Sequence, residues 1–390
     1  MAVLAGCARR VPAGPAVPDA VLVDTNAGLA LLRGSATRVL GAGLPTPSGT
    51  AVWTTGDGTI LRRVETRTGE VGTEIPLPGR WVPRVVAPDD TQVALTAPGG
   101  DRYRPVGRDR TTILVAANGG IRHRLELAGN YEPDAFAREG TALFVLEWLP
   151  PAAPDRYRVR CVDLATGRFT AMLTREKQPV PVGTEEQMRG QGRQAVSAPG
   201  GQTLYTLYTR QPGAARAEGG WDEESAGFVH TLDTQVGWAY CLDLPDPFGT
   251  GPAAAHTIAI TPDGQRLLVA DLSSGRLAVA DPNELKILNI LPVPTGTGTA
   301  YAAVSADSQR LYLGIGADLH VLDLAAGKAL ARWDAGGDVR GLALNGDGTR
   351  LLVGYPGAVG WCGTADGAPQ GRVPVPGLIE LRQCYGALTG

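Results

Sequence analysis

Lysine, histidine, cysteine and methionine are scarce in this sequence, and it has no long apolar run. The basic residues are 33 arginines and 3 lysines, and the formal net charge of the 390 residues is −3 at pH 7. This balance offers no global basic field for nucleic acid. The longest uncharged stretch, Ile287–Ala306, contains two prolines and two glycines, so it fails as an apolar span of about 20 residues. The excess of arginine is typical of a high-GC genome, and we expect an actinobacterium-like source.

The local motifs of common enzymes are also missing. We find no HExxH, no GxSxG elbow, no P-loop and no GxGxxG after a strand. No pair of cysteines has CxxC or other metal-site spacing, which makes zinc unexpected. The sequence therefore predicts no cofactor and no metal, and no local motif supports catalysis.

Glycine and proline, in contrast, are abundant. The 53 glycines and 30 prolines are 83 of 390 residues, about 21% against roughly 12% in average proteins. They are spread evenly without a Gly-X-Y period. This pattern predicts frequent tight turns between short elements.

The first residues resemble the start of a lipoprotein. Leu4, Ala5, Gly6 and Cys7 are similar to a lipobox, in which the cysteine is lipidated and the chain is cleaved before it. Residues 1–19 then represent a truncated signal-like start and a Pro-rich tether. The resemblance implies a membrane-anchored, extracytoplasmic protein. The alternative is a cytoplasmic protein in which Cys7 is an ordinary thiol.

The remaining cysteines leave two interpretations open. Their even number is compatible with two disulfides in an exported protein, with three possible connectivities. Buried free thiols explain them equally well. The residues concerned are Cys161, Cys241, Cys362 and Cys384.

A turn flanked by extended runs occurs seven times along the chain. Measured at the last residue of each turn, the spacings are 41, 50, 61, 63, 44 and 40 residues. A period of 40 to 44 with larger insertions in the middle predicts an array of four-stranded units. The seven turns are 47–50, 88–91, 138–141, 199–202, 262–265, 306–309 and 346–349.

The unit is clearest after residue 255. We expect strands, called A to D, at 256–261, 266–270, 276–281 and 286–293. Each run is short, rich in Val, Ile, Leu and Tyr, and bounded by turn residues. No segment has a sustained helical period, so the chain is predicted to be all-β.

A second turn, between strands C and D, begins with an acid and ends with glycine. It occurs at 65–69, 163–167 and 323–327. The acid can accept backbone N–H bonds while the glycine takes the left-handed conformation. Because the same chemistry returns wherever the same turn is needed, we interpret these acids as structural rather than catalytic.

The Pro-Asp-Gly type of A–B turn, the strands ending in Val-Leu-Asp or Val-Ala-Asp, and the Asp-x-x-x-Gly turn resemble bacterial YVTN/WD40-like (TolB-like) β-propellers. The resemblance covers a single domain, residues 20–385, although the Gly-His and Trp-Asp signature of true WD40 blades is absent. It implies the fold but not the function, because propellers host quinoprotein enzymes, lactonases and binding scaffolds alike.

The strand count favours eight blades. Seven complete units lie between residues 44 and 377, and residues 20–24, 28–32 and 37–40 resemble B, C and D strands without an A. Residues 378–382 could supply that A strand, so that both termini build one blade and close the ring. A seven-bladed ring is the alternative.

Four enlarged loops are expected on one face, which carries the B–C and D–A connections. They are residues 97–110, 149–155, 175–194 and 210–227 of blades two to four. We expect this face to bind a ligand, since loops carry most grafted function, although insertions also accumulate at little cost.

Arginines beside tyrosines in these loops can stack on and fork to carboxylates, phosphates or sugars, or can instead pair with acids of a neighbouring loop. The candidate binding residues are Arg102, Tyr103, Arg104, Arg108, Arg110, Arg156, Tyr157, Arg210, Trp221, Asp222, Glu223 and Glu224.

Among the four histidines, only His256 opens an inner strand, and it is the candidate for the central channel. The overall expectation is a monomeric, non-catalytic binding module of the cell envelope whose partner is a protein or a small ligand. Two alternatives stay open. One is a quinoprotein- or lactonase-like enzyme with a site over the channel, and the other is a cytosolic scaffold.

Overall fold

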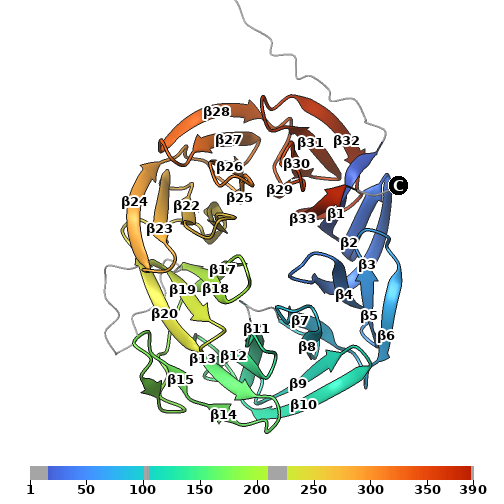
Figure 1. The fold of residues 1–390 in the computed structure, drawn as a ribbon, viewed down its shortest axis with the longest axis vertical. Helices are drawn as coiled ribbons and strands as arrows, with labels where there is room; N and C mark the ends of the chain where they lie inside the picture. Colours follow the sequence, from blue (N-terminus) through green and yellow to red (C-terminus); the bar gives the residue numbers. More distant parts are fainter. Residues whose placement is uncertain (1–15, 101–102, 104, 210–225, 388–390) are drawn as a thin grey trace, which may run out of the picture.

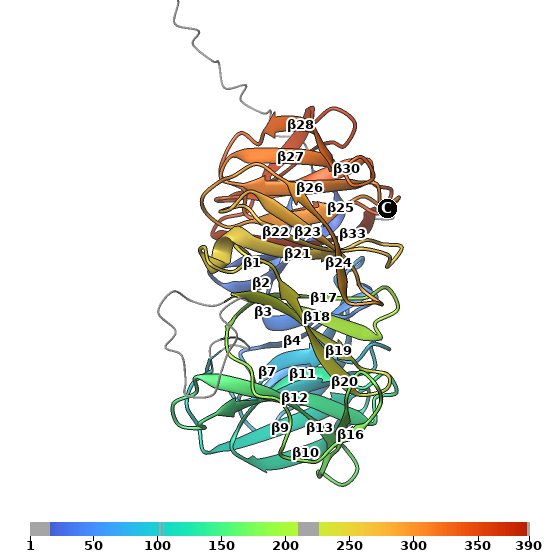
Figure 2. The same cartoon turned by 90° about the vertical axis from the view of Figure 1, so that its left-hand side faces the viewer.

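The computed structural model describes residues 16–100, 103, 105–209 and 226–387. These residues form strands β1 to β33 and one 3-10 helix, Ala253–Ala255, which confirms the predicted all-β class. In this part of the chain no helix has the length and apolar character needed to cross a bilayer. The sheets are arranged radially around one axis (Figure 1), and Figure 2 shows the same ring from the side.

The sheets form eight four-stranded blades, in which strand A is nearest the axis and strand D is outermost. The innermost strands of most consecutive blades contact one another around the axis, for example β21 with β25 and β29 with β33. Blade 2 is β7 (Val82–Val86), β8 (Gln92–Thr96), β9 (Arg110–Ala117) and β10 (Gly120–Ala128). Blade 3 is β11 (Asn130–Phe136), β12 (Ala142–Leu149), β13 (Arg156–Asp163) and the very short β14 (Phe169–Thr170).

Blade 4 carries two additional strands. Its regular strands are β17 (Gln191–Ser197), β18 (Thr203–Thr209), β19 (Gly227–Asp233) and β20 (Trp238–Leu244). The additional strands, β15 (Met172–Leu173) and β16 (Pro179–Val180), extend the sheet beyond its outermost strand β20.

Blades 5 to 7 have the regular pattern. Blade 5 is β21 (His256–Ile260), β22 (Leu267–Asp271), β23 (Arg276–Asp281) and β24 (Lys286–Pro292). Blade 6 is β25 (Tyr301–Val304), β26 (Arg310–Ile315), β27 (Asp318–Asp323) and β28 (Lys328–Asp334). Blade 7 is β29 (Leu342–Leu344), β30 (Arg350–Tyr355), β31 (Ala358–Gly363) and β32 (Pro369–Pro374).

Blade 8 is built from both ends of the chain, as predicted. The C-terminal strand β33 (Leu378–Ala387) is its A strand and pairs antiparallel with β1 (Val17–Thr25), which pairs with β2 (Gly28–Gly34). Its D strand is the first half of β3 (Ala36–Pro45). This pairing leaves no open sheet edge where the ring closes.

Blades 8 and 1 share strand β3. The first half of β3 pairs with β2, and after a register shift at Gly41 and Ala42 the second half pairs with β4 (Ala51–Gly56). Blade 1 is then completed by β5 (Ile60–Glu65) and β6 (Val71–Pro76). One strand is therefore outermost in one blade and innermost in the next, so these two blades need no D–A loop.

The cores lie between adjacent blades, because alternate residues of each strand face opposite sides of its sheet. One core joins Leu125 and Leu127 of blade 2 to Phe136 of blade 3. Another joins blade 7 to blade 8 and includes Leu381 of β33. No blade can bury both of its faces alone, so stacking in a ring is what stabilises each one.

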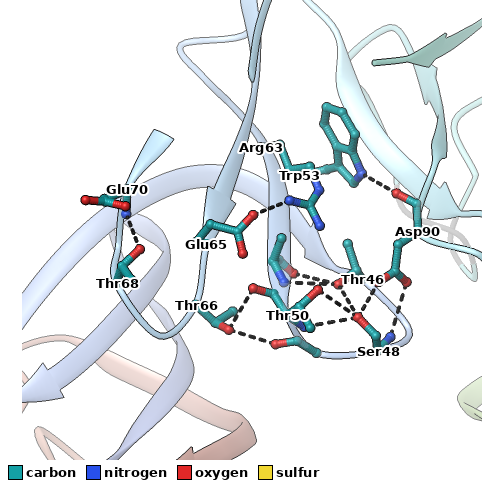
Figure 3. Close-up of polar contacts among 12 residues, drawn as sticks. Thr46, Ser48, Thr50, Trp53, Arg63, Glu65, Thr66, Thr68, Glu70 and Asp90 are labelled. Carbon is teal, nitrogen blue, oxygen red and sulfur yellow. Dashed lines mark hydrogen bonds and ion pairs between the residues drawn. The ribbon is translucent and has the colours of Figure 1, made fainter. Parts of the chain in front are cut away.

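The repeated turns lie on the turn face, defined as the side that carries the A–B and C–D connections. In blade 1 the Ser48 amide donates to Asp90 of blade 2 at 3.2 Å, and the Trp53 indole donates to the Asp90 carbonyl at 3.4 Å (Figure 3). The Thr66 hydroxyl donates to the Gly49 carbonyl at 2.8 Å. These contacts join the turns within a blade and between blades.

Two of the three C–D acids, Asp163 and Asp323, have the structural role inferred from sequence, whereas the third, Glu65, pairs with Arg63 of its own strand. The Asp163 carboxylate accepts hydrogen bonds from the Thr166 amide at 2.8 Å and from its hydroxyl at 2.7 Å. The same bonds lower the pKa of Asp163. Asp323 likewise accepts from two backbone amides. The carboxylates are occupied in holding their own turns.

Candidate functional site

The opposite side of the ring, the loop face, carries the B–C and D–A connections. Two of its loops form what we call the loop surface, residues 97–100, 103, 105–109 and 149–155. The Arg108 amide donates to the Pro151 carbonyl at 3.0 Å, so the blade 2 and blade 3 loops are joined directly. The two loops approach each other so closely at Gly107 that a Cβ on this residue would overlap the Ala152 backbone. Separate insertions thus make one continuous surface.

The blade 2 loop reaches across blade 3 as far as blade 4. The Tyr103 ring meets Tyr208 edge-on at 6.2 Å between centroids and covers Gly192, where a Cβ would overlap the ring. Tyr103 is thus partly buried and anchors its loop, while Arg110 begins β9 and is exposed.

Buried charge supports the loop surface from below. Glu132 of β11 is 1% exposed, and its carboxylate lies 3.0 Å from Arg84 and 3.7 Å from Arg108. Arg84 also donates to the carbonyls of Gly99 and Gly100 at 3.3 Å. The arrangement ties the start of the blade 2 loop to the inner strands. Arg108 thus pairs with an acid, but that acid belongs to the inner strand β11 and not to a neighbouring loop.

Arg156 is also paired, since it donates to Asp155 at 2.9 Å and to Gln187 at 2.7 Å. Tyr157 was expected on the binding face, but the structure places it in the core. It is 0% exposed and stacks on Tyr208 at 4.8 Å between centroids. The reason is strand alternation: β13 begins at Arg156, so Arg156 and Tyr157 point to opposite sides of the sheet.

A second charged cluster lies along β13. The Glu147 carboxylate accepts from the Tyr131 hydroxyl at 2.9 Å, from Arg158 at 2.6 Å and from Arg160 at 3.1 Å. Burial raises the pKa of Glu147, but these hydrogen bonds and charges outweigh burial and lower it. Burial and the neighbouring carboxylate raise the pKa of Tyr131 to about 12. Sequence reasoning did not identify this cluster, although the alternating pattern Arg-Tyr-Arg-Val-Arg in β13 could have indicated a row of arginines on one face of the strand.

The long connection from blade 3 to blade 4 departs from the expectation. The rim insertion, residues 171–190, runs along the outside of the ring rather than only on the loop face. Leu173 pairs with Trp238 of β20, and Met188 pairs with Tyr157 of β13. The short β14 pairs only with Cys161 and Val162, which leaves the rest of the outer edge of β13 for the insertion.

Cations hold the rim insertion against blade 4. The Lys177 ammonium lies 4.4 Å above the Trp238 ring, and the Arg175 guanidinium lies 5.3 Å above the Tyr240 ring. Arg175 also donates to the Glu284 carbonyl of blade 5 at 2.7 Å.

A cavity of about 370 Å³ lies between the rim insertion and the facing strands of blades 3 and 4. Its floor includes His230 of β19 and Cys241 of β20, and the insertion contributes Met172 and Met188. Burial lowers the pKa of His230 to about 4, although the negative charge of Asp134 acts to raise it. The imidazole is therefore neutral at pH 7. Burial also raises the pKa of the Cys241 thiol. No sequence motif pointed to this cavity.

His256 does begin an inner strand, but it is not in the channel. It is 0% exposed, and its Nε2 accepts from the Gly249 amide at 3.0 Å while Nδ1 lies 3.0 Å from the Pro252 carbonyl. The Asp271 carboxylate is 3.4 Å from Nε2. The connection after β20, which contains Gly249 and Pro252, packs on the imidazole. His256 is therefore a buried contact between blades 4 and 5.

All four described cysteines are free thiols, so the disulfide interpretation is not the one found in the structure. Cys161, Cys241, Cys362 and Cys384 belong to four different blades. The other sequence candidates lie outside the described residues. They are Cys7, Arg102, Arg104, Arg210, Trp221, Asp222, Glu223 and Glu224.

Within residues 16–100, 103, 105–209 and 226–387, no three side chains among His, Cys, Asp and Glu gather as a metal site. The described loop surface presents paired charges over a core of aromatic rings. Such a surface can hold a partner but offers no grouped nucleophile, base and acid.

No family model and no curated protein matches the chain. The chain is similar in structure to apo AztD from Citrobacter koseri, at 12% identity and a TM-score of 0.60, over 94% of this chain and 97% of that one. It is also similar to the dihydro-heme d1 dehydrogenase NirN in complex with DHE, at 13% identity and a TM-score of 0.59, over 97% and 77% of the two chains. A eukaryotic initiation factor matches at 12% identity and a TM-score of 0.51, over 95% and 98%. At these identities the likeness concerns the fold alone. Together with the eight blades formed by its own sheets, this likeness identifies the chain as an eight-bladed β-propeller.

Proposed function

We propose that this propeller is a non-catalytic binding module of the cell envelope, anchored by a lipid on Cys7, and that it engages a partner through the loop surface. The observation that supports this function is the joining of separate insertions. The blade 2 and blade 3 loops are linked by the bond from Arg108 to Pro151, and Tyr103 extends the contact to blade 4.

Ordering these loops costs conformational entropy. Insertions that lengthened without selection for function are therefore not expected to pack on one another. Here the loops pack tightly and are supported by the buried Glu132. A surface of this kind is preorganised, which reduces the entropy lost when a partner binds. The exposed Arg110 at its margin suits carboxylate or phosphate groups of that partner.

Site-specific photo-crosslinking in the native host tests the surface. A benzophenone amino acid replaces Arg110 on the loop face, or Gln309 on the turn face as the matched control. We expect a discrete adduct from position 110 and none from position 309. Equal crosslinking from both positions, or an adduct from position 309 alone, would refute the assignment of the binding face.

Anchoring is tested separately. Cells labelled with a palmitate analogue should incorporate it into the protein, and Cys7→Ser should abolish incorporation and release the protein from the membrane fraction. A Cys362→Ser variant, which removes a buried thiol of blade 7, should be labelled like the wild type. Unlabelled wild-type protein would refute the anchor and leave the binding surface to be judged by the crosslinking result.

A further inference from the structure

The cavity beneath the rim insertion gathers the rarest side chains of the chain. The whole sequence contains 3 methionines, and the two after Met1 are Met172 and Met188 of the rim insertion. Both are buried, at 4% and 5% exposure, and both line the same cavity as His230 and Cys241. Leucine would fill the same volume, so packing alone does not explain why both internal methionines lie here.

The donor atoms converge from three separate elements. His230 of β19 and Cys241 of β20 are direct partners in the antiparallel ladder, so their side chains point to the same face of blade 4. Met188 approaches from the insertion, where two backbone hydrogen bonds with Tyr157, at 2.9 and 2.7 Å, fix its position. The Met188 Sδ atom lies 3.4 Å from the Cys241 Sγ atom.

His230 supplies an independent indication of a ligand. Its side chain is 2% exposed, and its Nε2 atom has no hydrogen-bond partner. A buried polar atom without a partner costs free energy, so an imidazole nitrogen left in this state, in a cavity that sulfur-bearing side chains also line, is suited to accept a metal.

We infer that this cavity is a binding site for a soft monovalent metal ion, Cu⁺, held by Cys241 Sγ, Met188 Sδ and His230 Nε2, with Met172 in the same wall. Thiolate and thioether ligands select Cu⁺, and imidazole also suits copper. With metal–sulfur bonds of about 2.3 Å, two sulfurs 3.4 Å apart subtend roughly 95° at the ion, which a three- or four-coordinate site accommodates.

Charge favours a monovalent ion over a divalent one. When Cu⁺ binds, the Cys241 thiol releases its proton to solvent and forms a Cu–S bond, so that the ion and the thiolate together are neutral. A divalent ion on the same three ligands would leave a net positive charge on them, at a large desolvation cost. The carboxylates in the cavity lining do not offset that charge at the floor, because Glu185 already pairs with Arg158 and Arg160 while Glu176 and Glu186 are exposed. The lining of the cavity includes Tyr240, which is 43% exposed, so the cavity reaches the surface of the molecule.

Methionine-methyl NMR tests the site directly on the full chain. With ¹³C-methyl methionine, at most three signals appear, and Met172→Leu and Met188→Leu variants assign two of them. One equivalent of Ag⁺, a redox-inert substitute for Cu⁺, should shift the Met188 signal and, as its neighbour in the cavity, the Met172 signal. If both methyl signals stay in place while Ag⁺ binds, the site is refuted, whatever other thiols take up the ion.

Affinity for Cu⁺ is then measured anaerobically against a chromophoric Cu⁺ chelator. Met188→Leu keeps every thiol and nearly the same volume, and it should weaken binding at least tenfold, as should His230→Gln. The matched control Cys362→Ser should stay within twofold of the wild type. Near-ultraviolet circular dichroism verifies that each variant is folded. Unchanged affinity in folded Met188→Leu would overturn the proposed ligand set.

Discussion

Closure of the ring by β33 can be tested by truncating one buried side chain. Leu381 is 2% exposed in the core between blades 7 and 8, whereas Ile379 on the same strand is 52% exposed. Leu381 also donates its amide to the Arg340 carbonyl at 2.6 Å, and a Cβ on Gly341 would overlap the Leu381 carbonyl. Leu381 therefore lies where the last strand, β33, packs on and hydrogen-bonds to blade 7.

The size of the effect follows from burial. Leu381→Ala removes about three carbon groups, worth roughly 0.8 kcal/mol each, or about 2.4 kcal/mol, and the residual cavity raises the loss to as much as about 5 kcal/mol. At about 2.1 cal/mol/K per residue, 390 residues unfold with an entropy of about 0.8 kcal/mol/K, so the melting temperature should fall by about 3 to 6 °C. Ile379→Ala should change the stability by less than about 0.5 kcal/mol, which is under about 1 °C.

Differential scanning fluorimetry measures both variants, and hydrogen exchange shows where protection is lost. We expect Leu381→Ala to speed exchange in β1, which pairs with β33 although it lies more than 350 residues away in sequence. Equal melting temperatures for the two variants, or undiminished protection of β1, would refute the closure of the ring by the two termini.

Three further outcomes are expected. Glu147→Gln removes the nearer carboxylate of Arg158 and Arg160, which keep Glu185 at 3.6 and 3.5 Å, and should cost about 2 kcal/mol in denaturant unfolding. Glu74→Gln in an exposed pair should cost under about 1 kcal/mol, and similar losses would contradict the role of the buried cluster. Burial alone would raise the pKa of Asp271, but the neighbouring His256 imidazole and the hydrogen bonds that Ser273 and Ser274 donate lower it below its usual 3.8. Because the folded-state pKa is the lower one, its stabilisation is present above about pH 4 and is lost as pH falls further, so melting temperatures from pH 2 to 6 should vary less in Asp271→Asn. Burial raises the pKa of Cys362 to about 11 and of Cys384 to about 12, so a thiolate-selective reagent at pH 8 should modify them only after unfolding, as mass spectrometry of peptides would show.

Much of the fold could be predicted from local sequence because the propeller repeats a local unit. The turn at 262–265 and its flanking runs contain all the information needed for β21 and β22, since an antiparallel pair is fixed by its turn and its alternation. The eighth blade followed from the same reasoning, because residues 378–382 form a strand without a partner nearby in sequence and residues 20–24 lack an A strand.

The candidate sites depended on contacts that local patterns do not contain. Tyr157 belonged to an Arg-Tyr-Arg run directly after the predicted loop 149–155, and only the start of β13 at Arg156 decided that Tyr157 faces the core. His256 was correctly placed at the start of an inner strand, yet the chain that folds over it decided that it is buried.

The sequence by itself determined the all-β class and the repeated unit, because each depends on alternation and turn chemistry within about 40 residues. The pairing of the two termini was favoured only by counting those units and finding strands left over at both ends. Only the tertiary structure decided which side chains meet. The cavity of His230, Cys241, Met172 and Met188 exists because β14 is short and the rim insertion pairs with β13 and β20 instead. Such meetings depend on how neighbouring blades pack, and residues from 172 to 241 carry no shared local pattern that would place them together.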